Sequence, residues 1–420
     1  MVVISRMMRT LIVLAVLVAL AQPAHAAILR PNALDRQVDA IADARLLQAP
    51  AVALVDPDRQ EAAARLMRWE EPGWLAMIVF EILVLAYFWQ SGTAARLRDR
   101  LRLHVRSMFL VRFLFGCCLG ALAKCTALPF EFYLYRVNRI MGLSGQLSLG
   151  WIADWFFALL IDVAFAGCVT AIVLWLSDRT RRWYMYTIFA ILAGSVIITY
   201  ANPFVIAPLS NRYVPLHAPL AGDLQQLERK AGYENVPIEM YDRSKRTQTI
   251  GANVIGFGAT RIITLSDTLV AASTPGEVEF YTARAIGHVK LGDPMRLAII
   301  EALIVILGTA FAVIVADRIG FRRDDDPLAR IALVGALLGV MYLVAVPIDN
   351  ACSRAIEGQA DSYAIALTHD PAPAIRAMIR RADEQIESPC PGVLARLYFL
   401  RGPAIGERVQ TYNSIPSRCP

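Results

Sequence analysis

The sequence is poor in charge. Only 19% of its 420 residues are charged, against about a quarter in an average soluble domain. Hydrophobic residues make up 56% of the chain, and its mean hydropathy is +0.46. The net charge of +6 is modest, and no basic run is interleaved with aromatic residues, which argues against nucleic acid as a partner. The composition excludes an ordinary soluble domain and favours an integral membrane protein.

Residues with metal-binding side chains are sparse. The seven cysteines show no metal-ligand spacing, and none of the five histidines is followed by glutamate, so the zinc motif H-E-x-x-H is absent. Cys390 and Cys419 lie in a polar C-terminal tail, where a disulfide between them is one hypothesis. Four others lie in apolar stretches, where burial as small apolar residues is expected: Cys117, Cys118, Cys125 and Cys168.

Residues 1–26 resemble a secretory signal peptide. Arg6 and Arg9 precede an apolar run at 11–20, and Ala24-His25-Ala26 supplies an A-x-A-like cleavage site. The run is too short to cross a bilayer comfortably, so we expect cleavage after Ala26. An uncleaved anchor is the alternative.

Six further apolar stretches are long enough to span a membrane as helices. The alternate connections between them are rich in arginine, which predicts that those connections are cytoplasmic and that the segments between them lie on the exterior side. The expected spans are 74–89, 108–128, 151–176, 183–201, 297–316 and 331–348.

The polar region between the fourth and fifth stretches predicts a small exterior domain. Residues 218–232 have the pattern of an amphipathic helix, 236–241 and 261–265 that of strands, and 277–291 that of a helix ended by Gly292. The expected organisation is therefore a signal peptide (1–26), an exterior segment (27–71), a four-span membrane domain (72–203), a metallopeptidase-like domain (204–295), two further spans (296–350), and a C-terminal part of that domain with a tail (351–420).

The name of that domain rests on a resemblance. Four segments, in order along the chain, are similar to the type-1 CAAX prenyl proteases, a family of integral-membrane zinc metallopeptidases, in its bacterial branch. They are PFEFY at 129–133, PLSNRYVPL at 208–216, RSKR at 243–246 with GANVIGFG at 251–258, and SRAIEGQAD at 353–361. The resemblance implies a water-filled intramembrane chamber, zinc as the cofactor, and a sheet-edge strand carrying Asn253, Gly256 and Gly258 on which a substrate chain is laid.

The catalytic motif is degenerate. Such peptidases hold zinc with two histidines of H-E-x-x-H and a later glutamate, and the motif's own glutamate activates water. Here Arg284 stands in the first ligand position, Ala285 in the general-base position and His288 in the second ligand position. Glu357 keeps the third ligand position, and Asp361 lies one turn further on. We hypothesise that Arg284 pairs with both acids in the vacated site.

Two arginines complete the expected site. Arg354 and Arg408, like Asp361, are expected to support the ligand positions from behind, as the family pattern implies. Relatives carry a histidine before a proline, where this chain has Gly402 between Arg401 and Pro403.

We therefore expect a mainly α, multi-span helical membrane protein that encloses a chamber, with a small α+β metallopeptidase-like domain on the periplasmic or exterior side of the inner membrane. By descent it is a membrane zinc metalloendopeptidase, interpreted as a pseudopeptidase that binds polypeptide or lipid, with zinc absent or weakly bound. An active peptidase with atypical ligands is one alternative. A transporter or channel using Glu81, Asp162 and Glu301 within the spans is another. Expected partners are membrane lipid and unfolded or lipid-linked polypeptide.

Overall fold

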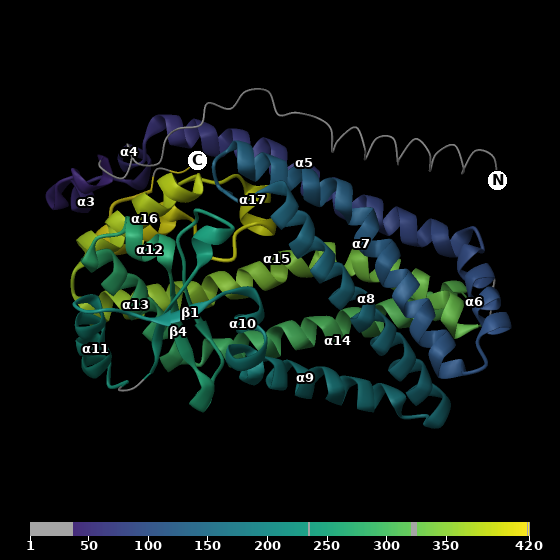
Figure 1. Ribbon diagram of the computed structural model, residues 1–420. Coiled ribbons are helices and arrows are strands. Elements are labelled where there is room, and N and C mark those ends of the chain that lie inside the picture. Colours follow the sequence, from purple (N-terminus) through teal and green to yellow (C-terminus); the bar gives the residue numbers. More distant parts are fainter. Residues whose placement is uncertain (1–36, 234–235, 321–325, 418, 420) are drawn as a thin grey trace.

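The computed structural model describes residues 37–233, 236–320, 326–417 and 419. Within them lies an elongated molecule with a bundle of long helices at one end and a compact domain around a small sheet at the other (Figure 1). The expected signal peptide lies outside the described residues. The protein is a multi-pass integral membrane protein.

Six helices of the described chain are long and apolar enough to cross a membrane, which confirms the expected spans. Several exceed the apolar runs that revealed them, because hydropathy detects only the part that faces lipid. Their bounds are α5 Pro57–Gln90, α7 Met108–Ile140, α8 Ser148–Arg179, α9 Trp183–Val205, α14 Asp293–Gly320 and α15 Pro327–Thr368.

Two helices cross the domain borders expected from sequence. α5 begins after Asp56, whose side chain accepts hydrogen bonds from the backbone N–H groups of Asp58 and Arg59 at 2.8 and 3.2 Å. Residues 57–71, expected in a separate exterior segment, are thus part of the first spanning helix. α15 runs through residue 350 without a break into the sheet-bearing end. The spans and the sheet-bearing domain therefore share continuous helices.

The arginine-rich connections lie at the end of the bundle far from the sheet (Figure 1). The first contains a short helix, α6 (Thr93–His104). Arg98 and Arg102 of this helix contact Asp326, with Arg102 Nη2 2.6 Å from Oδ2. Asp326 also caps α15 by accepting from the N–H of Leu328 at 2.8 Å. The basic connection is thereby tied to the start of the longest helix.

The sheet-bearing domain contains a four-stranded sheet within the described residues, in the order β1-β2-β4-β3. β1 (Tyr213–Pro215) pairs antiparallel with β2 (Ile238–Tyr241), β2 parallel with β4 (Ile262–Ser266), and β4 antiparallel with β3 (Ala252–Ile255). β3 lies at an edge of the sheet, as the resemblance implied for this segment. The helices and turns of this region are α10 Ala207–Ser210, α11 Leu220–Ala231, η1 Arg243–Lys245, η2 Gly258–Thr260, α12 Asp267–Ala272, α13 Pro275–Leu291, α16 Pro371–Gln385, α17 Val393–Tyr398 and α18 Ile405–Asn413.

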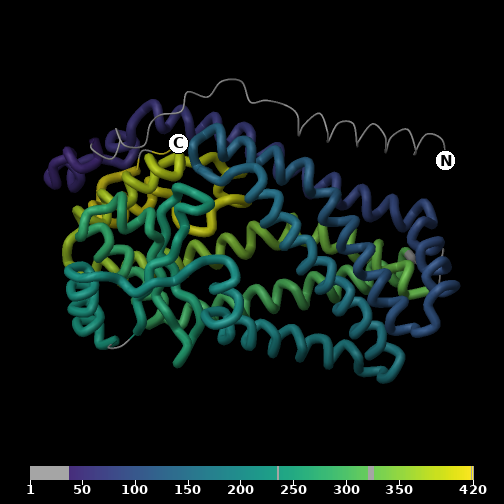
Figure 2. Tube along the Cα trace, viewed as in Figure 1, coloured from purple at the N-terminus to yellow at the C-terminus, as the bar shows by residue number. Residues whose placement is uncertain are grey.

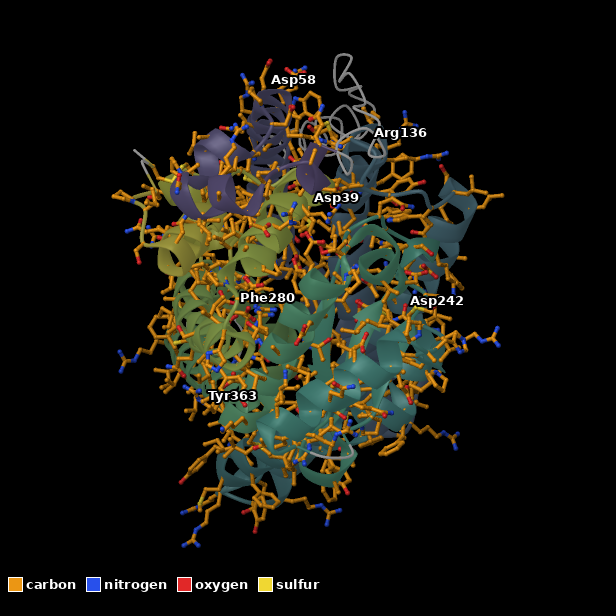
Figure 3. The ribbon with its side chains drawn as sticks, turned by 90° about the vertical axis from the view of Figure 1, so that its left-hand side faces the viewer. Asp39, Asp58, Arg136, Asp242, Phe280 and Tyr363 are labelled. Atoms are coloured by element: carbon orange, nitrogen blue, oxygen red, sulfur yellow. A yellow bond between two sulfur atoms is a disulfide. The ribbon has the colours of Figure 1, made fainter. Side chains whose placement is uncertain are left out.

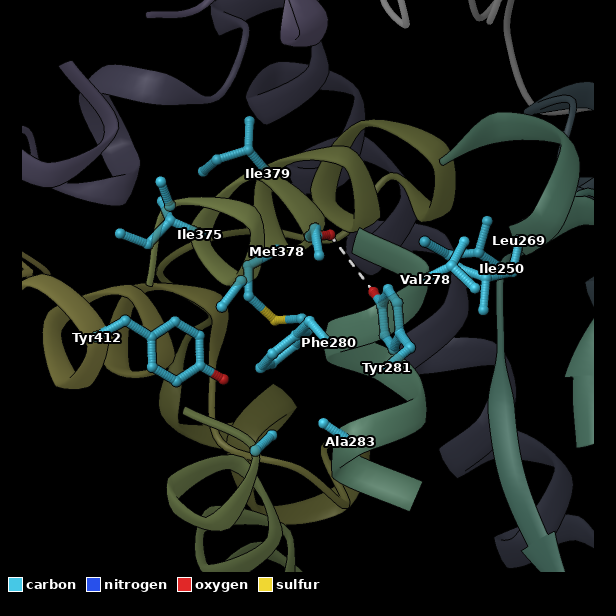
Figure 4. Close-up of a cluster of buried hydrophobic side chains, with 14 of the residues drawn as sticks. Ile250, Leu269, Val278, Phe280, Tyr281, Ala283, Ile375, Met378, Ile379 and Tyr412 are labelled. Atoms are coloured by element: carbon cyan, nitrogen blue, oxygen red, sulfur yellow. Dashed lines mark hydrogen bonds between the residues drawn. The ribbon is translucent and has the colours of Figure 1, made fainter. Parts of the chain in front are cut away.

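α13 is the central helix of this domain. Thr274 and Glu277 form a capping box at its start, and Gly292, with φ 68°, ends it in the left-handed region. One face of α13 packs into the main apolar core, where Phe280 meets Met378 of α16 and Tyr412 of α18 (Figure 4). This packing holds three separate parts of the chain around one site.

The N-terminal segment lies beside the C-terminal helices (Figure 2). It contains α3 (Asp43–Gln48) and α4 (Ala51–Leu54). Arg376 of α16 donates to the backbone oxygens of Val38 and Ile41 at 2.8 and 3.0 Å. Figure 3 views this end of the molecule, with Asp39 in the N-terminal segment. Asp39 contacts Arg380, and Arg380 also binds Glu277 at the start of α13. Arg380 therefore links the N-terminal segment to the start of α13.

A disulfide joins Cys390 to Cys419, as hypothesised from the sequence. It closes the C-terminal tail against the segment that follows α16. The cysteines expected to be buried in the spans are less enclosed: Cys117 is half-buried, and Cys118, Cys125 and Cys168 are exposed. The expectation of burial within the protein is therefore wrong for these three, because they lie on faces of α7 and α8 that no other segment of the described chain covers.

Ionisable residues within the spans have charged partners, either on the same helix or on another segment of the chain. Lys124 Nζ lies 2.8 Å from Glu131 Oε1 and 3.9 Å from Asp162 Oδ2. Arg401 lies 2.9 Å from Glu301 and thus links the C-terminal segment to α14. Such pairing lowers the free-energy cost of charge at membrane depth. It is consistent with a helical chamber with polar groups on its inner wall.

Candidate functional site

The site lies where α13 crosses α15. Gly287, one residue before His288, permits this crossing, because a β-carbon there would lie 2.9 Å from Tyr363 Cδ1 and 3.3 Å from the backbone oxygen of Ala360. The glycine thus brings the degenerate motif of α13 next to Glu357 and Asp361 of α15.

Arg284 lies between the two acids of α15, as hypothesised. Its Nη2 contacts Glu357 Oε2, and its Nε donates to Asp361 Oδ1 at 2.9 Å. The side chain is only 8% exposed. Burial lowers the pKa of Arg284, and the charge of Asp361 opposes that shift. Because an arginine starts from so high a pKa, the guanidinium remains a cation.

Ala285 offers no proton acceptor. It is 2% exposed and belongs to the apolar core of the domain. Its methyl group therefore packs where the general base of the motif would stand. A water molecule near Glu357 would therefore have no carboxylate at this position of α13 to accept its proton.

His288 retains the geometry of a ligand position. Its Nε2 lies 3.7 Å from Glu357 Oε1, while its Nδ1 is 2.8 Å from Asp293 Oδ2. Burial lowers the pKa of His288, an effect that the hydrogen bond to Asp293 opposes. Asp293 was missed from the sequence. The only available signal was its position directly after Gly292, where the chain turns from α13 into α14.

Arg408 of α18 approaches the same acids from the other side. Its Nη2 lies 3.4 Å from Glu357 Oε2, and its Nε lies 3.4 Å from Asp361 Oδ2. Its Nη1 also lies 3.7 Å from the sulfur of Met378. Burial and the charge of Asp361 act in opposite directions on the pKa of Arg408, and the net direction is upward. Two guanidiniums therefore face two carboxylates.

The remaining predicted residues lie elsewhere. Arg354 donates to the backbone oxygens of Arg396 and Leu400 at 2.7 and 2.9 Å, so these hydrogen bonds hold the segment around α17 and are not directed at the acids. Asn253 is exposed on β3, and its amide donates to Tyr241 across the sheet at 3.4 Å. Gly256 adopts φ 73° in the turn after β3, where a β-carbon would lie 2.5 Å from the backbone oxygen of Thr260. Gly258 also has positive φ but open space around it.

The side chains present do not fit a catalytic zinc ion. Among the described residues, no group of three or more histidine, cysteine, aspartate or glutamate side chains could hold a metal. His288 and Glu357 converge, but a third protein ligand is missing, and catalytic zinc needs three. The guanidinium of Arg284 contacts Glu357 directly, where it would repel a dication.

Comparison with known proteins identifies the scaffold. Residues 72–212 match the five-helix N-terminal region of CAAX prenyl proteases, and residues 218–415 match peptidase family M48. The chain belongs to the CAAX prenyl protease family. It is 24% identical to a Bacillus subtilis protein named uncharacterized metalloprotease YhfN, over 76% of this chain and 77% of that one. It is 25% identical to a CAAX prenyl protease 1 homolog of Dictyostelium discoideum, over 69% and 70%.

A solved structure has the same fold. The crystal structure of S. mikatae Ste24p aligns with a TM-score of 0.73, covering 94% of this chain and all of that chain at 19% identity. The order of spans and sheet expected from the four sequence segments is therefore the fold of this family.

Proposed function

We propose that this protein is a pseudopeptidase, a membrane-embedded metalloprotease homologue that has exchanged zinc for an internal arginine and binds polypeptide without cleaving it. The observation that carries the proposal is the contact of Arg284 with Glu357 and Asp361 in the buried centre of the site. A permanent cation from the chain itself neutralises the acids that a metal would otherwise balance.

Loss of hydrolysis follows from two changes that reinforce each other. Ala285 removes the group that accepts a proton from water, and such a group commonly contributes a factor of about 100 to 10,000 in rate. Arg284 removes a ligand and adds a repelling charge. Each change alone lowers activity, and together they leave no described pair of groups suited to activating water for attack on a peptide bond.

Polypeptide binding is supported by the sheet edge. β3 pairs with β4 on one side and forms the edge of the sheet on the other. An edge strand offers backbone N–H and C=O groups to an extended chain, which gives affinity with little dependence on sequence. β3 also packs against α13, so a chain added there would run beside the helix that carries Arg284. We expect lipid-linked polypeptides as a further class of ligand, because the site would open toward an intramembrane chamber.

We further propose that the sheet-bearing domain faces the exterior of the inner membrane. The arginine-rich connections lie at the opposite end of the bundle, which the charge rule assigns to the cytoplasm. The Cys390–Cys419 disulfide is of the kind that persists in an oxidising compartment. This orientation argues against cytosolic prenylated proteins as ligands.

The proposal is tested by metal analysis and proteolysis on the purified full chain. After incubation with excess zinc and removal of unbound metal, we expect far less than one zinc per chain and no casein cleavage above background. Near-stoichiometric zinc with chelator-sensitive cleavage of casein would instead establish an active peptidase with atypical ligands.

A restored motif provides the matched positive control. The double variant Arg284→His with Ala285→Glu recreates the missing ligand and base, and we expect it to retain about one zinc per chain. Adding His288→Ala to that variant should abolish the retention of zinc, because the second ligand is lost.

Polypeptide binding is tested with unfolded casein. We expect the wild type to bind it, and we expect Gly256→Pro, next to the β3 edge, to weaken that binding.

A further inference from the structure

A second cavity lies at the opposite edge of the sheet from β3. It has a volume of about 410 Å³ and opens between α11 and the β1–β2 side of the sheet. Its apolar wall includes Leu216, Leu224, Val236 and Ile238. None of these residues belongs to the Arg284 site, so the cavity is separate from the site described above.

One buried carboxylate lines this cavity. Glu228 of α11 is 5% exposed, and its Oε1 is buried without a hydrogen-bond partner. The neighbouring Arg229 is exposed, and no described hydrogen bond or ion pair joins the two side chains. A buried carboxylate without a partner is destabilising, so its presence calls for a compensating group.

The surroundings of Glu228 limit the chemistry of that group. A metal ion would need several oxygen ligands, whereas the described residues of the cavity lining contribute a single carboxylate. A guanidinium would need both carboxylate oxygens for a bidentate contact, but Oε1 is closed off from solvent. A primary ammonium group is smaller and requires only Oε2 of Glu228. The alkyl chain that carries this group would lie along the apolar wall.

We propose that this cavity binds a primary alkylammonium group, with Glu228 as the counter-ion and the wall around Leu224 receiving the aliphatic stem. Such a group is found at the end of a lysine side chain and in free aliphatic polyamines. Gln225, exposed beside the cavity on the same helix, offers an amide oxygen as a further acceptor. The desolvation that accompanies burial raises the pKa of Glu228 to about 7, which is consistent with a carboxylate held without its counter-charge.

The test uses isothermal titration of the purified full chain in a neutral detergent at pH 8. The probes are 1,5-diaminopentane, Nα-acetyl-lysine amide, and pentan-1-ol as the uncharged analogue. We expect both amines to bind and the alcohol not to bind. Tighter binding of the lysine derivative would assign the site to a polypeptide side chain, and tighter binding of the diamine would assign it to a polyamine.

The variant Glu228→Gln should weaken amine binding by about tenfold or more, the factor associated with a charge-assisted hydrogen bond. Asp223→Asn, on an exposed position of the same helix, should change the affinity less than about twofold. Ala221→Trp fills the cavity from its lining and should abolish binding while the thermal unfolding transition is retained. Equal affinity in wild type and Glu228→Gln, or no amine binding by the wild type, would overturn the proposal.

Discussion

Gly402 lies so close to Arg408 that a β-carbon at position 402 would collide with Nη2 of the arginine. The guanidinium of Arg408 occupies the space that a side chain at position 402 would need. The inward position of Arg408 depends on the absence of a side chain at position 402. It brings a second positive charge to Glu357 and Asp361.

This relationship predicts the effect of Gly402→Ala. The added methyl group forces Arg408 away from the two acids, so we expect a loss of about 1–3 kcal/mol in the free energy of unfolding. Gly358→Ala is the matched control, because a β-carbon there meets only Pro403 Cγ at 3.9 Å. That control lies inside α15 and should stabilise the protein by about 0.5–1 kcal/mol. Chemical denaturation in detergent measures both, and equal effects would contradict the packing described.

Arg284 is expected to be essential for stability. Arg284→Ala leaves the buried Asp361 and the half-buried Glu357 facing Arg408 as their remaining guanidinium partner, and breaking such a pair typically costs on the order of 3 kcal/mol. Arg65→Ala, which removes an exposed pair with Glu61 on α5, should cost less than about 1 kcal/mol. Thermal unfolding at equal detergent concentration provides the comparison. An unchanged unfolding temperature in Arg284→Ala would show that other groups balance the charges of the two acids.

The carboxyl of Glu228 predicts a pH dependence of stability. Its pKa rises from 4.5 to about 7 in the folded protein, so the folded state binds more protons than the unfolded state between these values. Stability therefore falls as pH rises through this window, by up to about 3 kcal/mol. Glu228→Gln removes this contribution. The free energy of unfolding of Glu228→Gln, compared with that of the wild type, should be lowest below pH 4.5 and highest above pH 7.

Denaturation at pH 5 and pH 8 tests that slope, without an amine ligand present. Asp223→Asn is expected to retain the wild-type difference between the two pH values. A wild-type slope in Glu228→Gln would assign the pH dependence to other groups.

The proposed orientation is tested by cysteine labelling. Asp223→Cys lies on the exposed face of α11 in the sheet-bearing domain, and Arg100→Cys lies on α6 at the basic end. In intact spheroplasts we expect a membrane-impermeant maleimide to label the first and not the second, with the wild type as the blank for native cysteines. Labelling of both should follow permeabilisation. The reverse pattern would invert the topology.

Much of the fold was predictable because its signals are local. Hydropathy located the spans, and Gly292 marked the end of α13. The contact of Arg284 with Glu357 and Asp361 was also predictable. It needs only the family order of motifs and helical spacing, since residues four apart lie on the same helix face.

Other features depend on tertiary contacts that local patterns do not encode. The extension of α5 back to Pro57 follows from its cap and from the packing of Ala62, Ala63 and Leu66 against α7. The bond between His288 and Asp293 forms across a turn between two helices. Arg354 lies on the helix face expected for the site, but its long side chain reaches the carbonyl groups around α17 instead.

The continuity of α15 has a mechanical consequence. Its 42 residues extend about 63 Å at 1.5 Å per residue, from the basic end next to Asp326 past the acids that contact Arg284. Tilting of this rod in the bilayer must move Glu357 and Asp361 unless the helix bends, and Pro347 supplies a point where one backbone hydrogen bond is missing. We therefore expect bilayer thickness to affect the contacts of Arg284 and Arg408 with the two acids. A change from short-chain to long-chain lipids should shift the unfolding temperature of the wild type more than that of Arg284→Ala.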